Sequence, residues 1–164
     1  MDPVSLIRLV AGWTQRRLAQ AAGTSQPTIA AYEGGSKSPT WRTISGIAGA
    51  AGLACYPSVG SPLTRDQARS LVLHQAIVAE LMAHPDTVIA TAQRNLVTMR
   101  HSNPGASRLL DDWGSILRQP PQRMASQLLD PGEHGRDLRQ VTPFAGVLDP
   151  RRRLAVYRKF GAAA

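Results

Sequence analysis

The stretch from Gln15 to Gly35 constrains the fold of this chain more than any other part of the sequence. It predicts two short helices joined by a tight turn. Thr14 can cap the first helix, over 15–22, because a side-chain oxygen there accepts from unpaired amides of the first turn. Gly23 follows at the point where a helix can end in a left-handed backbone, which glycine adopts most easily. Ser25 can cap the second helix as Thr14 caps the first.

Small and apolar side chains recur at helical spacing through this stretch. Leu18 and Ala19 belong to the first helix, and Ile29 and Tyr32 belong to the second. We expect all four to point inward, with Ala19 small enough for the two helices to cross closely. A helix pair of this kind is the helix-turn-helix pattern, in which the second helix enters the major groove of DNA.

A longer segment, Leu9–Leu53, resembles the Cro-repressor, or XRE, family of DNA-binding domains. The resemblance covers about a third of the chain. It implies a small helical domain over residues 1–55 that binds double-stranded DNA. The residues that carry it are Thr14-Gln15, Leu18-Ala19, Gly23, Ser25-Gln26, Thr28-Ile29, Tyr32-Glu33-Gly34 and Pro39, followed by an amphipathic helix that ends at Gly52.

The resemblance implies a base-reading role for Gln26. In the family, a glutamine at this position reads adenine through a bidentate contact of its amide. The alternative is a solvated surface glutamine. Ser25 and Thr28 are expected within reach of bases or phosphates, and Ala30 or Ala31 is expected beside a thymine methyl group.

A second set of side chains is expected to contact DNA phosphates. The family uses a glutamine at the position of Gln15, at the amino end of its helix, to fix a phosphate. Such contacts position the protein without specifying the DNA sequence. For the basic members of this set the alternative is a charged helix face that is only solvated. These basic candidates are Arg16, Arg17, Lys37 and Arg42.

Arg8 and Glu33 are expected to form a structural ion pair. In the family, an arginine and a glutamate at these positions tie the first helix to the end of the recognition helix. Two solvated charges are the alternative.

Two tryptophans are expected to fill the core of this first domain. Trp13 follows the first predicted helix, over 3–11, and is expected beneath the second helix. Trp41 begins the last predicted helix, over 41–51. Its position at helical spacing with other apolar residues predicts that it helps to close the core.

Composition limits the setting of the chain and its partners. The formal net charge of +8 suits a polyanion partner, either nucleic acid or an acidic protein. Cys55 is the single cysteine, so an intrachain disulfide and a cysteine-based zinc site are excluded. No apolar run is long enough to span a bilayer, and no signal-peptide pattern begins the sequence. We therefore expect a cytoplasmic protein without membrane contact.

The sequence carries no signal for catalysis. The four histidines, His74, His84, His101 and His134, show no ligand spacing with one another. There is no phosphate-binding glycine loop, no carboxylate pair with a basic partner and no nucleophile motif. His74 lies on the apolar face of its predicted helix, so we expect it in a core. The chain is predicted not to be an enzyme, and neither a metal nor a cofactor is expected.

Residues 56–62 predict a linker, because prolines, serines and a glycine dominate them. Residues 63–164 then predict a helical regulatory or partner-binding domain, so the whole chain is expected to be all-α. The first predicted helix of this second domain, over 64–83, begins with a capping box formed by Thr64 and Gln67. Further helices are expected over 85–100, 106–118, 120–129 and 151–160, with a turn or two of helix over 136–141.

The segment Pro143–Leu148, PFAGVL, resembles part of a helical module that follows XRE domains in bacterial regulators. Some of those regulators are antitoxins encoded beside a toxin protein. This resemblance implies a toxin partner held through residues 63–164. The basic helix after it, Arg151–Lys159, has three interpretations: a solvated end, a clamp on DNA phosphates, or a docking helix for an acidic partner.

Together these patterns predict a transcription regulator, a repressor that binds a palindromic operator as a homodimer. An antitoxin is one form of it, in which the second domain holds the toxin. The main rival is a one-component sensor with a small-molecule pocket in the helical domain, and an adaptor without DNA binding is a third interpretation. The sensor needs a deep apolar pocket, whereas a solid core with an exposed patch favours a protein partner. The residues expected to line such a pocket are Leu71, Val78, Leu96, Leu110 and Trp113.

Overall fold

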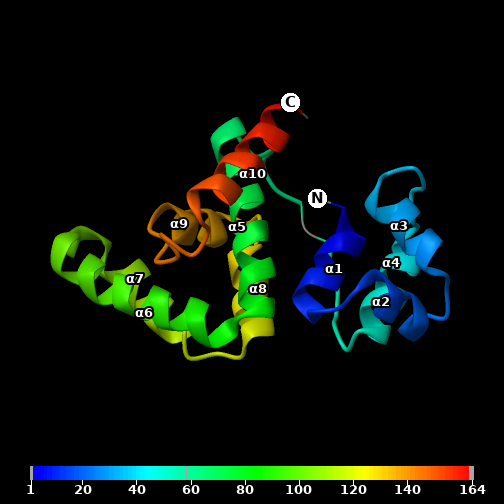
Figure 1. Ribbon diagram of the computed structural model, residues 1–164, viewed down its shortest axis with the longest axis horizontal. Coiled ribbons are helices and arrows are strands. Elements are labelled where there is room, and N and C mark those ends of the chain that lie inside the picture. The colour runs from blue at the N-terminus through cyan, green and yellow to red at the C-terminus, as the bar shows by residue number, and fades with distance from the viewer. Residues whose placement is uncertain (1, 58, 163–164) are drawn as a thin grey trace. The chain divides into compact units, whose positions relative to one another are not determined.

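The computed structural model describes residues 2–57 and 59–162, and the regular elements in those ranges are all helices (Figure 1). The all-α prediction is confirmed. The chain divides into two compact units, of which the first ends at Val59 and the second begins at Gly60. Each unit is described by itself.

The first unit is a bundle of short helices, each preceded by a side-chain cap. Helix α2 packs against α3, α1 packs against α3 and α4, and α4 packs against α2. The caps Asp2, Thr14, Ser25 and Thr40 each accept a hydrogen bond from the amide three residues later. The helices are α1 (Pro3–Ala11), α2 (Gln15–Ala21), α3 (Gln26–Glu33) and α4 (Trp41–Ala50).

The turn between α2 and α3 depends on the backbone of Gly23. Its φ of +64° lies in the left-handed region. A Cβ at this position would meet no atom within 4 Å. Glycine is therefore needed here for the left-handed backbone and not to avoid a steric clash. Thr24 N then donates to Ala19 O at 2.9 Å, which closes the end of α2. Helix α2 therefore ends one residue before the predicted Ala22.

The core of the first unit is built where these helices cross. Leu18 and Ile29 are fully buried, and Ala19 is 3% exposed. Ile47 and Ala48 bring the middle of α4 against the same cluster. Leu18, Ala19 and Ile29 are therefore buried as predicted, whereas Tyr32 packs against the cluster but is only half-buried.

The two tryptophans behave differently from their predicted roles. The prediction for Trp41 is wrong, because 49% of this residue is exposed. Trp41 is the first residue of α4, and the contacts of α4 with the core begin one turn later, at Ile44. Trp13 packs against the core but remains half-buried at its edge.

The second unit is organised around its first and longest helix, α5. Helix α5 packs against α6, α8, α9 and α10, while α7 packs against α6, α8 and α9. Thr64 and Gln67 form the predicted capping box at its start. The elements are α5 (Arg65–Ala83), α6 (Pro85–Ser102), the 3₁₀ turn η1 (Pro104–Ala106), α7 (Ser107–Ile116), α8 (Pro121–Leu128), α9 (Glu133–Gln140) and α10 (Pro150–Ala162).

The loop before α10 is held by side chains from several helices. Phe144 makes an edge-to-face contact with Trp113, with ring centroids 5.4 Å apart. Asn95 Nδ2 donates to Pro143 O at 2.7 Å and to Ala145 O at 2.8 Å. Trp113 is itself fully buried, and its Nε1 donates to Leu138 O. This part of the PFAGVL segment therefore has a structural role in the second core.

His74 of α5 is 1% exposed and forms part of this core. Its Nδ1 lies 2.8 Å from Ser70 O, and its Nε2 lies 3.0 Å from Thr142 Oγ1. Burial, assisted by the positive charge of Arg139 and opposed by the hydrogen bond to Ser70, lowers the pKa of His74 from 6.5 to about 4. The neutral imidazole donates to the Ser70 carbonyl and accepts from the Thr142 hydroxyl.

Helix α9 begins at Glu133, three residues before the predicted 136–141. Asp130 Oδ1 accepts from Gly132 N at 2.9 Å and turns the chain into the helix. A Cβ on Gly135 would lie 2.3 Å from Asp130 O, so this close return of the backbone requires a glycine.

Arg139, on the same helix α9, is 4% exposed. Its Nη1 donates to Leu128 O at 3.1 Å and to Asp130 O at 2.5 Å, which satisfies carbonyls at the end of α8. Burial lowers the pKa of its guanidinium group. Among the described residues, its buried Nη2 has no hydrogen-bond partner.

Candidate nucleic-acid interface

The amino ends of α2 and α3 are joined by a side-chain hydrogen bond. Gln26, the first residue of α3, donates from Nε2 to Gln15 Oε1 at 2.8 Å. Gln15 is the first residue of α2, so the contact joins two helix starts across the turn. The structure thereby brings together the expected base-reading residue and one expected phosphate-binding residue.

This contact continues inward to an ion pair. Gln15 Nε2 donates to Glu33 Oε2 at 2.9 Å. Arg8 donates from Nε to Glu33 Oε1 at 2.6 Å and from Nη2 to Oε2 at 3.1 Å. The side chains of Arg8 and Glu33 are 24% and 9% exposed, so water is largely excluded from the carboxylate. The bidentate pair ties α1 to the last residue of α3.

The four residues form one ordered chain, Arg8–Glu33–Gln15–Gln26. Because Glu33 takes the amide nitrogen of Gln15, the oxygen of that amide is turned toward Gln26. Gln26 is exposed, and its Oε1 and second Nε2 hydrogen stay available to a base edge. The sequence predicted the Arg8–Glu33 ion pair and separate DNA contacts for Gln15 and Gln26, but not that the four residues form one network.

Ser25 and Thr28 lie beside Gln26 and contact each other. Ser25 Oγ accepts from Thr28 N at 3.3 Å, and the two hydroxyl oxygens lie 2.9 Å apart. Both side chains therefore belong to the cap of α3. Ala31, half-buried on α3, accepts at its carbonyl from Lys37 N at 3.1 Å. This bond fixes the start of the loop after α3.

The four basic candidates are all exposed, but one of them is held by an aromatic ring. The guanidinium carbon of Arg17 lies 4.6 Å from the ring centroid of Trp13, a cation–π distance. This contact explains the position of Trp13 at the edge of the core and gives Arg17 a preferred orientation. Arg16, Lys37 and Arg42 are exposed on α2, on the loop after α3 and on α4.

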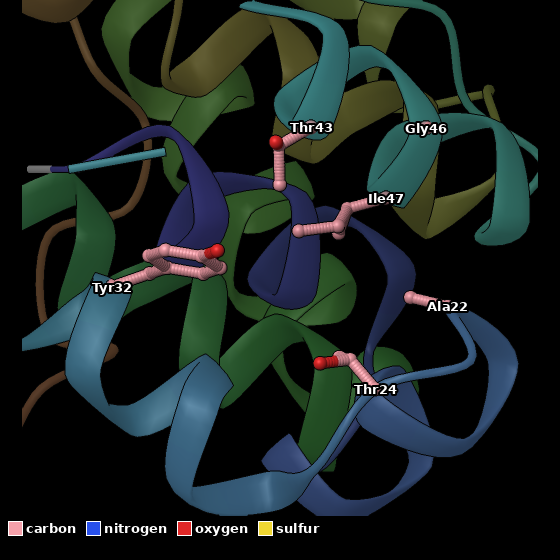
Figure 2. A pocket seen from close by; sticks show the side chains of 6 residues that line it. All are labelled: Ala22, Thr24, Tyr32, Thr43, Gly46 and Ile47. Atoms are coloured by element: carbon pink, nitrogen blue, oxygen red, sulfur yellow. The ribbon is translucent and has the colours of Figure 1, made fainter. Parts of the chain in front are cut away.

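A small hollow of about 210 Å³ lies elsewhere on the first unit (Figure 2). Ala22 and Thr24 from the turn, Tyr32 from α3, and α4 line it; the lining residues of α4 are Thr43, Gly46 and Ile47. None of the expected DNA-contacting residues takes part in it. The hollow is therefore separate from the candidate interface.

The residues expected to line an effector pocket instead fill a core. Val78 and Trp113 are 0% exposed, Leu110 is 1% exposed and Leu96 is 6% exposed. A side chain that faced a cavity large enough for a ligand would present accessible surface to it. Leu71 is half-buried.

The described residues offer neither a metal site nor a membrane-spanning helix. Within 2–57 and 59–162, no group of three or more His, Cys, Asp and Glu residues is placed to hold a metal ion. No helix in the same part of the chain is long and apolar enough to cross a membrane.

Comparison with known proteins places the first unit in a described class. Residues 6–54 match the family described as "Helix-turn-helix domain". The match begins within α1 and ends just after α4, so it covers the paired helices and the network described above. No curated protein and no solved structure matches the chain.

Proposed function

Because residues 6–54 form a helix-turn-helix DNA-binding domain, we propose that the protein is a transcription regulator of XRE type that reads an operator through α3. Its expected mode of action is repression, by occupying DNA near a promoter. The observation that carries this proposal is the Arg8–Glu33–Gln15–Gln26 chain, because it presents an exposed amide at the start of the second helix.

The hydrogen-bonded network Arg8–Glu33–Gln15–Gln26 orients Gln26 for a bidentate contact with adenine. Adenine offers N7 as an acceptor and its N6 amino group as a donor on the major-groove edge. The free hydrogen on Gln26 Nε2 matches N7, and Gln26 Oε1 matches the amino group. Because Gln15 already orders this side chain, less conformational entropy is lost on binding.

The basic residues around α3 supply contacts of a different kind. Arg16, Arg17, Lys37 and Arg42 are exposed, and each can neutralise a phosphate. Gln15 can add a phosphate contact through the outer edge of its amide. Such contacts raise the affinity for any duplex and make it dependent on salt concentration.

Substitution of Gln26 and of Arg17 should therefore weaken binding in different ways. Gln26→Ala is expected to cost about 1–3 kcal/mol on the operator and little on random DNA. Arg17→Ala is expected to weaken both and to reduce the slope of log affinity against log salt by about one unit. Binding titrations on the upstream region of the chain's own gene and on random duplex, at several salt concentrations, measure both quantities.

Gln20→Ala is the matched control, because Gln20 is an exposed glutamine on the same helix pair without a contact in the network. It should leave both affinities unchanged. Equal losses for Gln26→Ala on operator and random DNA would remove Gln26 from the reading set. A wild-type protein without preference for any upstream segment would contradict the regulator proposal itself.

The proposed operator is a palindrome bound by a homodimer. Two copies of α3 must then meet the major groove about one helical turn apart, centre to centre. A footprint on the upstream region should contain two similar half-sites at this spacing. Inserting about half a turn of DNA between them should greatly weaken binding. A single protected half-site bound by one copy would contradict the dimer.

For the second unit, the packed core argues against a small-molecule pocket at the expected residues, and we propose a protein partner instead. The side chains that would line an effector pocket, among them Val78 and Trp113, have no accessible surface. A toxin held by this unit, with the whole protein acting as its antitoxin, is the specific form of the proposal. Purification of the untagged complex from its native host tests it. A second chain in stable stoichiometry supports it, and recovery of this chain alone contradicts it.

A further inference from the structure

Helix α10 carries an excess of positive charge on its exposed surface. Arg151, Arg153, Arg158 and Lys159 are all exposed, and we call them the α10 basic face. No acidic residue follows Asp149 in the sequence. In α10, which lies wholly inside the described ranges, no residue is buried.

The helix is nevertheless fixed to the second unit on one side. Arg152 forms an ion pair with Glu80 of α5, and Asp149 Oδ1 caps the helix by accepting from Arg152 N at 2.9 Å. Val156 and Phe160 follow Arg152 at intervals of one helical turn, and both are half-buried. Leu154 lies off this stripe and is 49% exposed. The helix therefore lies on α5 through one stripe of residues.

Two residues of the α10 basic face, Arg151 and Arg153, do not stabilise the helix that carries them. They lie in the first turn, where the helix dipole disfavours positive charge, and the acidic residue beside them is the cap Asp149. Neighbouring arginines also repel one another. Arg152 is compensated by Glu80, but Arg151 and Arg153 stand on either side of it. A bound external anion would offset this electrostatic repulsion.

We propose that the α10 basic face binds the phosphate backbone of duplex DNA beside the operator. This inference rests on the proposed function, because it needs the first unit to hold the chain on DNA. The second unit then adds phosphate contacts that do not depend on the base sequence of the DNA, while α3 selects the operator.

The composition of the surface favours DNA over an acidic protein. Cores of protein interfaces are apolar and poor in charged residues. On α10 the exposed large apolar side chains are Leu154, at 49%, and Tyr157, at 37%. Arg69 of α5 lies over the Tyr157 ring at 5.9 Å, which covers part of it with another positive charge. Guanidinium groups match phosphate oxygens in pairs, and three of the four residues of the α10 basic face are arginines.

The covalent connection between the units supports the same partner. Cys55 packs against the core of the first unit, and α5 begins at Arg65. The ten Cα–Cα steps from Cys55 to Arg65 can therefore span at most about 36 Å. Once the first unit is bound to its operator, this tether keeps α10 at high local concentration around the adjoining DNA.

The test compares two double variants of the full-length chain. Arg151→Ala/Arg158→Ala removes two charges from the α10 basic face. Arg118→Ala/Arg123→Ala removes the same charge from exposed positions elsewhere in the second unit and serves as the matched control. The probes are a short operator duplex that holds only the two half-sites contacted by α3, a long operator duplex with about 20 base pairs of natural sequence added on each side, and a random duplex as long as the long operator duplex.

On the long operator duplex, the α10 variant should lose affinity on the order of tenfold near physiological salt. Its slope of log affinity against log salt should be smaller by about two units, since about 0.9 counterion is released for each phosphate contact. On the short operator duplex its affinity should match that of the wild type. The random duplex should show the same loss as the long operator duplex. Circular dichroism spectra and melting curves verify that both variants are folded.

Several outcomes would overturn the inference. Wild-type affinity of the α10 variant on long DNA would show that the helix does not contact the duplex, and would leave a solvated end or a docking helix for an acidic protein. Equal losses in the two double variants would show that net charge alone is responsible. In both cases the wild type would still prefer its operator, so the proposed function would stand. A wild type without any operator preference marks a failure of the proposed function instead.

Discussion

Replacing Glu33 by alanine is expected to destabilise the first unit by about 3 kcal/mol. The carboxylate of Glu33 accepts two hydrogen bonds from Arg8 and one from Gln15, and its side chain is 9% exposed. Removing it leaves the guanidinium group of Arg8 in a partly buried site without its counter-charge. Because Arg8 is 24% exposed, water can recover part of the loss, so the effect should lie at the lower end of the range for buried pairs.

Hydrogen exchange of the amides in α1 and α3 measures this effect within the full-length chain. The double variant Arg8→Met/Glu33→Leu is the matched control, since it removes both charges and leaves neither unpaired. It should be less destabilised than Glu33→Ala, because no charge is left unpaired in the partly buried site. Unchanged exchange in Glu33→Ala would show that the ion pair contributes nothing to stability.

The same substitution should also reduce discrimination between DNA sequences. Without Glu33, the amide of Gln15 can turn over and no longer offers its oxygen to Gln26. Affinity for the operator should then fall more than affinity for random DNA, under conditions where the variant remains folded. If both affinities fall equally, the network serves stability alone.

Acidification is expected to weaken the second unit through His74. The pKa of His74 is about 4 in the folded chain and 6.5 in its ordinary state, so the unfolded chain binds the proton first as the pH falls. The stabilisation is fully present above pH 6.5 and is lost progressively as the pH falls from 6.5 to 4. At about 1.4 kcal/mol for each pKa unit, the loss approaches about 3 kcal/mol.

Urea unfolding at pH 7 and at pH 4 measures this loss, with the fluorescence of Trp113 as the reporter. A background with Trp13→Phe and Trp41→Phe makes the signal specific to the second unit. His74→Gln is the control, because it keeps a hydrogen-bonding side chain that does not titrate. Carboxylates contribute equally to both proteins, so the wild type should lose about 3 kcal/mol more than the variant. Equal losses would contradict a neutral, buried His74.

The sequence by itself determined the helices of the first unit and the turn between the paired ones. These features depend on neighbours along the chain. Thr14 and Ser25 cap amides three residues away. Gly23 sets a single backbone angle. The resemblance to the XRE family implied that Arg8 pairs with Glu33. Gln26 is the first residue of its helix because Ser25 caps that helix.

Only the tertiary structure decided how the residues of the candidate interface act together. Gln15 and Gln26 are 11 positions apart, and their contact depends on the angle at which α2 and α3 cross. Trp41 has the spacing of a core residue, but the contacts of α4 begin at Ile44, so Trp41 is left exposed.

The second unit shows the same limit more strongly. His74 and Thr142 are 68 positions apart, and no local pattern pairs them. Apolar spacing identified Val78 and Trp113 as inward-facing, but it could not tell a pocket from a packed core. That difference depends on whether facing side chains fill the space between the helices, and only their packed arrangement determines it.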